Sequence, residues 1–128
     1  MSRYTEKAKQ ATRGSIVMEG RSKISTDEII ARYPDGISIN QFDMLNGKNG
    51  RYVVCCFNQN PQAFFNGGKV LTQIFESFIA DFKTAENTEA DAIELCQNDF
   101  AAAGGLKVRL STGHTKAGNR VTLVDVLD

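Results

Sequence analysis

The sequence predicts an α+β protein, mainly β with helices, that forms one folded domain. A chain of 128 residues fits a single domain and can bury a core without disulfides or metal. Both halves of the chain contain apolar residues that alternate with polar ones, as strands do. One long segment between them repeats apolar residues every three to four positions, which is typical of an amphipathic helix.

We expect residues 1–20 to form a basic, flexible arm, and we assign residues 21–128 to the folded domain. Residues 1–23 hold six Lys or Arg against two Glu. Such an arm is either a solvated terminus or a non-specific contact to phosphates or another acidic surface. No segment has the apolar core of a signal peptide or the ~20 apolar residues that span a bilayer. We therefore expect a cytoplasmic protein with no membrane partner.

The first elements of the domain are predicted to be a short helix and a bent strand. Ser25-Thr-Asp-Glu28 matches a capping box, and the helix that it opens runs through Arg32. Tyr33-Pro-Asp-Gly36 is a turn sequence that ends this helix. Residues 36–45 then predict a strand whose apolar alternation changes phase after Ile39, which indicates a bulge or a strong bend.

A hairpin and a short third strand follow. Asn46-Gly-Lys-Asn-Gly50 predicts a tight turn. Residues 51–58 predict a central strand, because both of its faces are apolar. Residues 63–65 predict a short third strand, with Pro61 at its start or edge.

The strongest helical pattern lies between the third strand and the last two. Its large apolar side chains are worth ~1.5–3 kcal/mol each when fully buried, so this helix should fill the core. Thr88-Glu-Ala-Asp91 matches a second capping box and opens a weaker helix that Gly104-Gly105 ends. The apolar positions of the core helix are Val70, Leu71, Ile74, Phe75, Phe78, Ile79 and Phe82.

Residues 106–111 and 119–127 predict two closing strands that pair as an antiparallel hairpin. A helix between the third and fourth of five strands is the element order of an OB-fold, a small barrel with a helix at one end. The predicted fold is therefore a five-stranded OB-like barrel with this core helix and one or two extra helices. The alternative is a general α+β sheet with helices on one face.

Four segments resemble the small single-stranded-DNA-binding-like proteins of bacterial phages and integrative elements: RSKISTDEIIARYPDGISINQFDML, YVVCCFN, FFNGGKVLT and GLKVRLSTGHTKAGNRVTLVDVL. The resemblance covers residues 21–127 and depends on element order and on the FF-x-GGKVLT segment, not on a catalytic signature. It implies an OB-type barrel that coats single-stranded DNA and permits a homo-oligomer.

Positive charge in two predicted turns is the main indication of a nucleic-acid site. In OB-folds the loops that join strands 1–2 and 4–5 bind nucleic acid, and here both loops hold cations. The alternative interpretation is a pair of solvated turns with ordinary surface lysines. An acidic middle segment, residues 24–101, argues against tight binding. The expected phosphate contacts are Lys48, Arg51, Lys69, Lys107, Arg109, Lys116 and Arg120, with His114 beside them.

Four aromatic residues are candidates for stacking on bases: Tyr52, Phe57, Phe64 and Phe65. Such stacking is worth ~1–3 kcal/mol per base. Phe64 and Phe65 are adjacent in a strand and point to opposite faces, so one of them can be exposed. Tyr52 is the best exposed candidate, because its hydroxyl tolerates water. Burial statistics favour the core for any single Phe.

Gly67-Gly68-Lys69 is not a phosphate-binding P-loop. Valine follows the lysine, and the glycine spacing that the P-loop needs is absent. The favoured interpretation is a glycine turn that leads into a helix, where Lys69 and free amides can meet one phosphate.

Enzymatic and metal-dependent functions are not indicated. Cys55 and Cys56 lie on opposite faces of one strand, and with Cys96 they are expected to be buried, reduced thiols. One histidine and no CxxC give no zinc site, and no carboxylate pair or nucleophile is recognisable. We therefore expect no cofactor, no metal and no small-molecule substrate.

The predicted function is non-enzymatic binding of single-stranded DNA with little sequence preference, in phage or mobile-element DNA metabolism. The alternative is a protein-interaction module that uses the same barrel or the basic arm.

Overall fold

The computed structural model of this chain describes residues 15–127. The basic arm predicted for residues 1–20 lies outside these residues except for its last six positions. In chain order the elements are α2 (Ser15–Met18), β1 (Ser22–Lys23), α3 (Thr26–Arg32), β2 (Ile37–Gly47), β3 (Gly50–Phe57), β4 (Ala63–Asn66), α4 (Gly68–Phe82), α5 (Glu89–Ala102), β5 (Leu106–His114) and β6 (Arg120–Val126).

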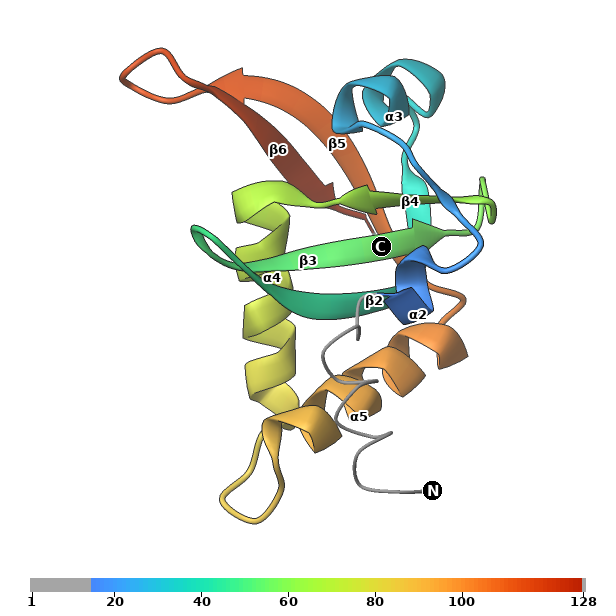
Figure 1. The fold of residues 1–128 in the computed structure, drawn as a ribbon, viewed down its shortest axis with the longest axis vertical. Helices are drawn as coiled ribbons and strands as arrows, with labels where there is room; N and C mark the ends of the chain where they lie inside the picture. Colours follow the sequence, from blue (N-terminus) through green and yellow to red (C-terminus); the bar gives the residue numbers. More distant parts are fainter. Residues whose placement is uncertain (1–14, 128) are drawn as a thin grey trace.

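The architecture is α+β, with one curled six-stranded sheet in the order β1-β4-β3-β2-β5-β6 (Figure 1). All neighbouring strands pair antiparallel except β1 and β4, which are parallel. The five predicted strands are all present, and the sixth is the two-residue β1, which the sequence pattern did not predict. In this order β6 is an edge strand, so the described sheet is open rather than closed between β4 and β6.

The predicted irregularity of the first long strand is confirmed. The pairing of β2 with β3 shifts register between Ile39 and Gln41, which is where the apolar alternation changes phase. Beyond the shift Phe42 and Met44 are buried in the core, as Ile37 and Ile39 are before it. The irregularity therefore keeps both halves of a long strand in contact with one core.

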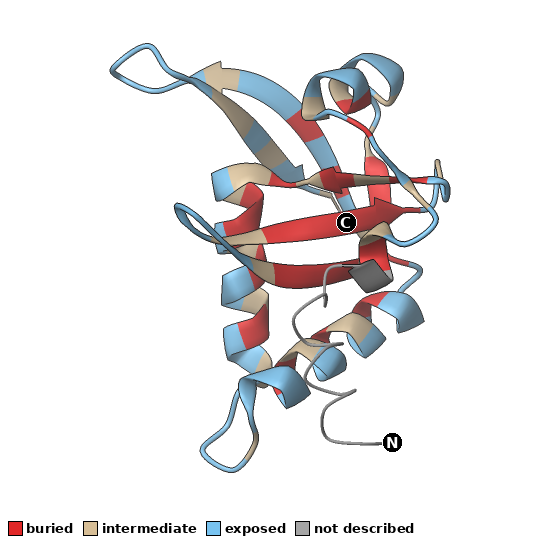
Figure 2. Ribbon diagram, in the orientation of Figure 1, coloured by how far each residue is buried: buried red, intermediate tan, exposed pale blue. Residues whose placement is uncertain are grey.

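Helix α4 packs its apolar face into the core, as the sequence predicts. Leu71, Phe75 and Ile79 are buried, whereas the other four apolar positions of the helix are half-buried. The ring of Phe75 lies 4.5 Å from that of Phe42 and meets that of Phe100 edge-on at 5.7 Å. Figure 2 shows buried residues concentrated on β2, β3 and the side of α4 that faces them. α4 and α5 therefore share one aromatic cluster with the sheet.

A second, smaller apolar cluster lies on the other face of β3. Val54 and Cys56 are buried there beneath Val17 of α2. The Cys56 thiol donates a hydrogen bond to the carbonyl of Val17 at 3.3 Å. Val17 of α2 therefore packs on this face of the sheet. The three cysteines are buried and unpaired with one another, as expected.

The helix ends follow the predicted capping residues with one difference. Thr88 and Asp91 form a full capping box at the start of α5. At the start of α3 the Ser25 hydroxyl accepts from the amide of Glu28, but the Glu28 carboxylate pairs with Arg32. In α5, whose apolar pattern is the weaker one, Leu95 is 47% exposed.

Candidate nucleic-acid interface

A cleft of about 690 Å³ lies between the β2–β3 hairpin and the first turns of α4. It brings together four residues that the sequence singled out, from three separate elements or turns. Sequence reasoning missed its other polar residues, although Asn49 lies within the predicted first turn and Asn66 directly precedes the double glycine. The lining residues are Gly47, Lys48, Asn49, Gly50, Arg51, Tyr52, Asn66, Gly68, Lys69, Thr72, Gln73 and Glu76.

The hairpin side of the cleft depends on two glycines. Gly50 has a positive φ of 115°, which the tight turn requires and which L side chains rarely adopt. A Cβ at Gly47 would lie 2.8 Å from Cε1 of Tyr52, so the tyrosine ring occupies the space that a side chain would fill. The turn between these glycines presents Lys48 to solvent.

The helix side of the cleft explains the Gly-Gly-Lys sequence. A Cβ at Gly67 would meet Leu71 at 2.6 Å and Val53 at 2.7 Å, so only glycine fits where the chain enters the core. Gly68 has a φ of 79°, and its amide donates to Oδ1 of Asn66 at 3.1 Å. The double glycine is thus a packing and backbone requirement, and it places the exposed Lys69 on the cleft wall.

Arg51 ties the hairpin to both long helices. Its guanidinium lies 3.4 Å from the Glu76 carboxylate of α4 and 2.9 Å from the Glu89 carboxylate of α5. Arg51 is therefore a positioning residue with a largely neutralised charge. Among residues 15–127 no carboxylate lies within ion-pair distance of Lys48 or Lys69, so these two lysines supply the uncompensated positive charge of the cleft.

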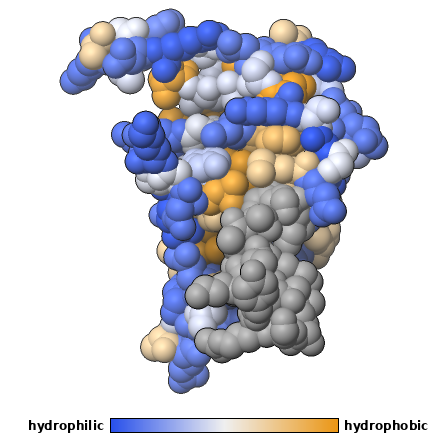
Figure 3. All heavy atoms as spheres, in the orientation of Figure 1, coloured by the Kyte–Doolittle hydropathy of each residue, from blue (hydrophilic) through white to orange (hydrophobic). Residues whose placement is uncertain are grey.

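The outer face of β3 and β4 adjoins the cleft and carries two half-buried rings. Tyr52 and Phe64 pack against the small cluster around Val54, with Leu45 beside them. Figure 3 shows apolar surface over the middle of the sheet between hydrophilic hairpins. Both rings therefore keep an exposed part that a base can contact.

Phe57 and Phe65, which the sequence suggested for stacking on bases, lie in the core and are not available to a base. Both are 0% exposed, and their rings pack edge-on at 5.7 Å inside the core. The physical reason is strand alternation, because residues 53, 55 and 57 point to the core while Tyr52 points outward. The same rule separates the neighbours Phe64 and Phe65, of which Phe64 is the half-exposed one.

The β5–β6 hairpin holds the second group of predicted cations. Lys107 and Arg109 are exposed on one face of β5, as the alternation predicts. Arg109 pairs with Asp125 at 3.1 Å, and Arg120 pairs with Asp27 of α3 at 2.5 Å. The exposed residues of this hairpin include Lys107, Arg109, His114, Lys116 and Arg120.

The two hairpins project to the same side of the molecule (Figure 1). The residues that line the cleft come from the β2–β3 hairpin, from Asn66 and from α4, and none comes from the β5–β6 hairpin. The predicted cations therefore form two groups, one at the cleft and one on the projecting hairpin, and not one continuous groove lining.

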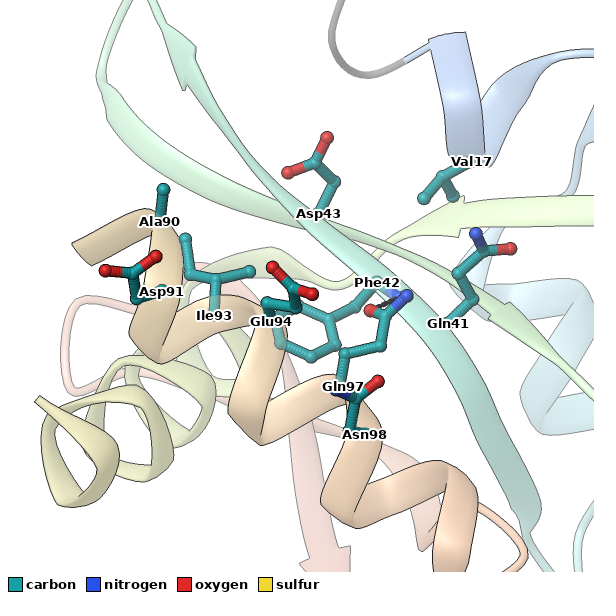
Figure 4. Close-up of a pocket in the computed structure, with 10 residues that line it drawn as sticks. All are labelled: Val17, Gln41, Phe42, Asp43, Ala90, Asp91, Ile93, Glu94, Gln97 and Asn98. Carbon is teal, nitrogen blue, oxygen red and sulfur yellow. Dashed lines mark hydrogen bonds between the residues drawn. The ribbon is translucent and has the colours of Figure 1, made fainter. Parts of the chain in front are cut away.

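A different pocket lies between β2 and α5 and has the opposite charge (Figure 4). Asp43, Asp91 and Glu94 line it together with amide side chains, and no lysine or arginine does. Gln97 accepts from the amide of Phe42 at 3.0 Å, and the capping hydrogen bonds from Thr88 lower the pKa of Asp91. No group of three or more metal-ligating side chains occurs within the described part of the chain. The three carboxylates make this pocket unfavourable for phosphates.

Comparisons with protein-family models, with curated proteins and with solved structures gave no match. Within residues 15–127, no helix has the length and apolar character needed to cross a bilayer.

Proposed function

We propose that this protein binds single-stranded DNA without catalysing a reaction and with little sequence preference, in the DNA metabolism of a phage or mobile element. The observation that carries the proposal is the convergence of Lys48, Tyr52 and Lys69 on one cleft beside the outer face of β3 and β4. Unpaired phosphates need cations, and unpaired bases need aromatic surfaces. The cleft and the adjoining face supply both within one surface.

The element order of an OB-type barrel, if this chain has it, points to the same face. In OB-folds the face of the second and third strands, together with the loops joining strands 1–2 and 4–5, binds oligonucleotides. Without the short β1, the second and third strands are β3 and β4, which carry Tyr52 and Phe64. The two loops are then the turn at Lys48 and the turn at Lys116. OB-folds are partly open barrels, so an open seam between β4 and β6 is compatible with this assignment.

The expected energetics are those of a weakly selective binder. Each phosphate neutralised on a single strand contributes a slope of about −0.7 to the dependence of log affinity on log salt. Lys48, Lys69, Lys107 and Lys116 are exposed and unpaired within the described residues, so binding should weaken steeply with salt. Stacking on Tyr52 and Phe64 adds a contribution that salt does not screen.

Fluorescence anisotropy with a labelled oligo-dT of about 20 nucleotides, at about 50 and 200 mM salt, tests the proposal. Binding at micromolar protein that weakens with salt, and that unlabelled duplex DNA competes for poorly, is the expected result. An unchanged anisotropy at tens of micromolar protein and low salt would contradict it.

A protein partner is the second candidate function, and one observation favours it. Leu123 and Val126 are 44% and 45% exposed on the edge strand β6. An exposed edge strand with apolar side chains can accept a strand from a partner chain. The same anisotropy experiment separates the candidates, because this function predicts no DNA binding. The basic arm, which the sequence also suggested as a contact, lies outside the described residues.

A further inference from the structure

We infer that the cleft between the β2–β3 hairpin and α4 holds one unpaired nucleotide, with its phosphate at the two lysines and its base against the amide side chains. The inference rests on the proposed function and adds to it a discrete subsite. Most of a bound strand would lie on the outer face of β3 and β4. One nucleotide would turn into the cleft, where the protein contacts its base as well as its phosphate.

The size of the cleft suits such a ligand. Its volume of about 690 Å³ falls within the range of about 300–1,000 Å³ that is usual for small-molecule sites. Gly50 and Gly68 line it without a side chain or a close neighbour, so a ligand can approach the backbone closely there. Gly68 has open space where a Cβ would lie.

The charges orient the nucleotide. Lys48 and Lys69 are exposed and have no carboxylate partner among the described residues, so the phosphate belongs beside them. Glu76 is the only carboxylate in the lining, and Arg51 lies 3.4 Å from it. A phosphate near Glu76 would be repelled, whereas an uncharged base there would not. The electrostatics therefore place the phosphate on the lysine side and the base on the other.

The amide side chains provide the polar edge that a base requires. Oδ1 of Asn66 accepts from the amide of Gly68, which leaves the Nδ2 group of Asn66 as a donor. Gln73 is exposed and makes no side-chain hydrogen bond within residues 15–127, so its amide offers a donor and an acceptor to a base edge. Tyr52, held against Gly47, supplies an aromatic surface at the same cleft.

The test uses the full chain, labelled with ¹⁵N, and three probes added separately: deoxyadenosine monophosphate, deoxyadenosine and inorganic phosphate. The expected result is saturable shifts of the backbone amides of the hairpin turn and of residues 66–76 with the nucleotide. The nucleoside and the phosphate should each shift the same amides with at least about tenfold weaker affinity, since each lacks half of the contacts and tenfold corresponds to about 1.4 kcal/mol.

Two variants and a control distinguish the two halves of the site. The double variant Lys48→Gln with Lys69→Gln should weaken the nucleotide and leave the nucleoside unchanged. Gln73→Met, of similar length and helix propensity, should weaken the nucleotide and the nucleoside alike. Lys83→Gln, at the other end of α4, should change neither.

The outcomes separate this inference from the proposed function. Oligo-dT binding without any cleft shift from the nucleotide would overturn the nucleotide subsite and leave DNA binding in place. Equal affinity for inorganic phosphate and nucleotide would also overturn it, because the cleft would then be an anion site alone. Absence of both oligo-dT binding and nucleotide shifts would overturn both proposals.

Discussion

The backbone of Gly47 lies against the ring of Tyr52, and a methyl group at Gly47 would come within 2.8 Å of the ring carbon Cε1. The two residues are on paired strands at the base of the β2–β3 turn, since Leu45 pairs with Tyr52 and Gly47 with Gly50. The absence of a side chain at one position therefore fixes the place of the aromatic ring at the other. That ring is part of both the outer face of the sheet and the cleft.

Gly47→Ala should displace the Tyr52 ring without unfolding the protein. The φ of Gly47 is not positive, so alanine is sterically allowed on the backbone and only the ring must move. We expect the affinity for oligo-dT to fall about as much as in Tyr52→Leu, by roughly 5- to 100-fold, since one stacking contact is lost. Anisotropy titrations of both variants, with thermal unfolding as the control, measure this. An affinity equal to that of the unmodified protein would exclude Tyr52 from the site.

Removing the two cleft lysines should change the salt dependence of binding. Lys48→Gln with Lys69→Gln eliminates two phosphate contacts, so the slope of log affinity against log salt should become shallower by about 1.4. Both side chains are exposed, and the melting temperature should stay nearly constant. Titrations at four salt concentrations give the slope, and Lys83→Gln, at the C-cap of α4 and away from the cleft, serves as the control. A slope that equals the control's would show that these lysines contact no phosphate.

Releasing Arg109 from its ion pair should strengthen DNA binding. Asp125 holds the Arg109 guanidinium at 3.1 Å on the exposed face of the β5–β6 hairpin. Asp125→Asn should raise the affinity about two- to fivefold at low salt, because one more cation becomes available. Lys107→Glu on the same face should lower it. Asp99→Asn, an exposed position on α5, controls for the loss of a negative charge; an equal gain in that variant would mean that only net charge matters.

The aromatic cluster should dominate stability. Phe75 is fully buried between Phe42 and Phe100, and Phe75→Ala should lower the free energy of unfolding by about 3–5 kcal/mol. Leu123→Ser, at a position 44% exposed on β6, should change it by less than about 0.5 kcal/mol. Urea unfolding followed by circular dichroism measures both. Comparable losses in the two variants would contradict the assigned core.

Cys96 should make the folded state less stable in alkali. Burial raises the pKa of its thiol from 9.0 to about 11, with smaller contributions from Asp99 and Asp81. Between these two values the unfolded thiol loses its proton while the folded one keeps it, so the unfolded state gains stability as the pH rises. The stability should fall by up to about 1.4 kcal/mol per pH unit in that window from this group alone.

The comparison of urea unfolding at pH 8 and pH 10, for the unmodified chain and for Cys96→Ala, measures this contribution. The variant loses some packing at both pH values. The informative quantity is therefore the change in unfolding free energy from pH 8 to pH 10, compared between the unmodified chain and the variant. A variant whose stability falls with pH as steeply as the unmodified chain's would show that Cys96 does not titrate in this way.

The sequence alone determined most of the local structure. The change of phase after Ile39 located the irregularity of β2, the Asn-Gly-rich turn located the first hairpin, and Thr88 located the start of α5. These features depend on contacts between residues close in sequence, which turn chemistry and apolar periodicity describe directly. The apolar periodicity of α4 also identified a helix that packs against the core.

The charges and rings that are available to a ligand depend on contacts between segments far apart in the sequence. Arg51 and Arg109 look alike in the sequence, yet their partners Glu76 and Asp125 lie 25 and 16 positions away along the chain. Phe57 and Phe64 are both strand aromatics, and the sheet buries one and half-exposes the other. Ion pairs and burial arise where distant segments meet, and no local pattern encodes the distance between them. The cleft between the first hairpin and α4 exists for the same reason.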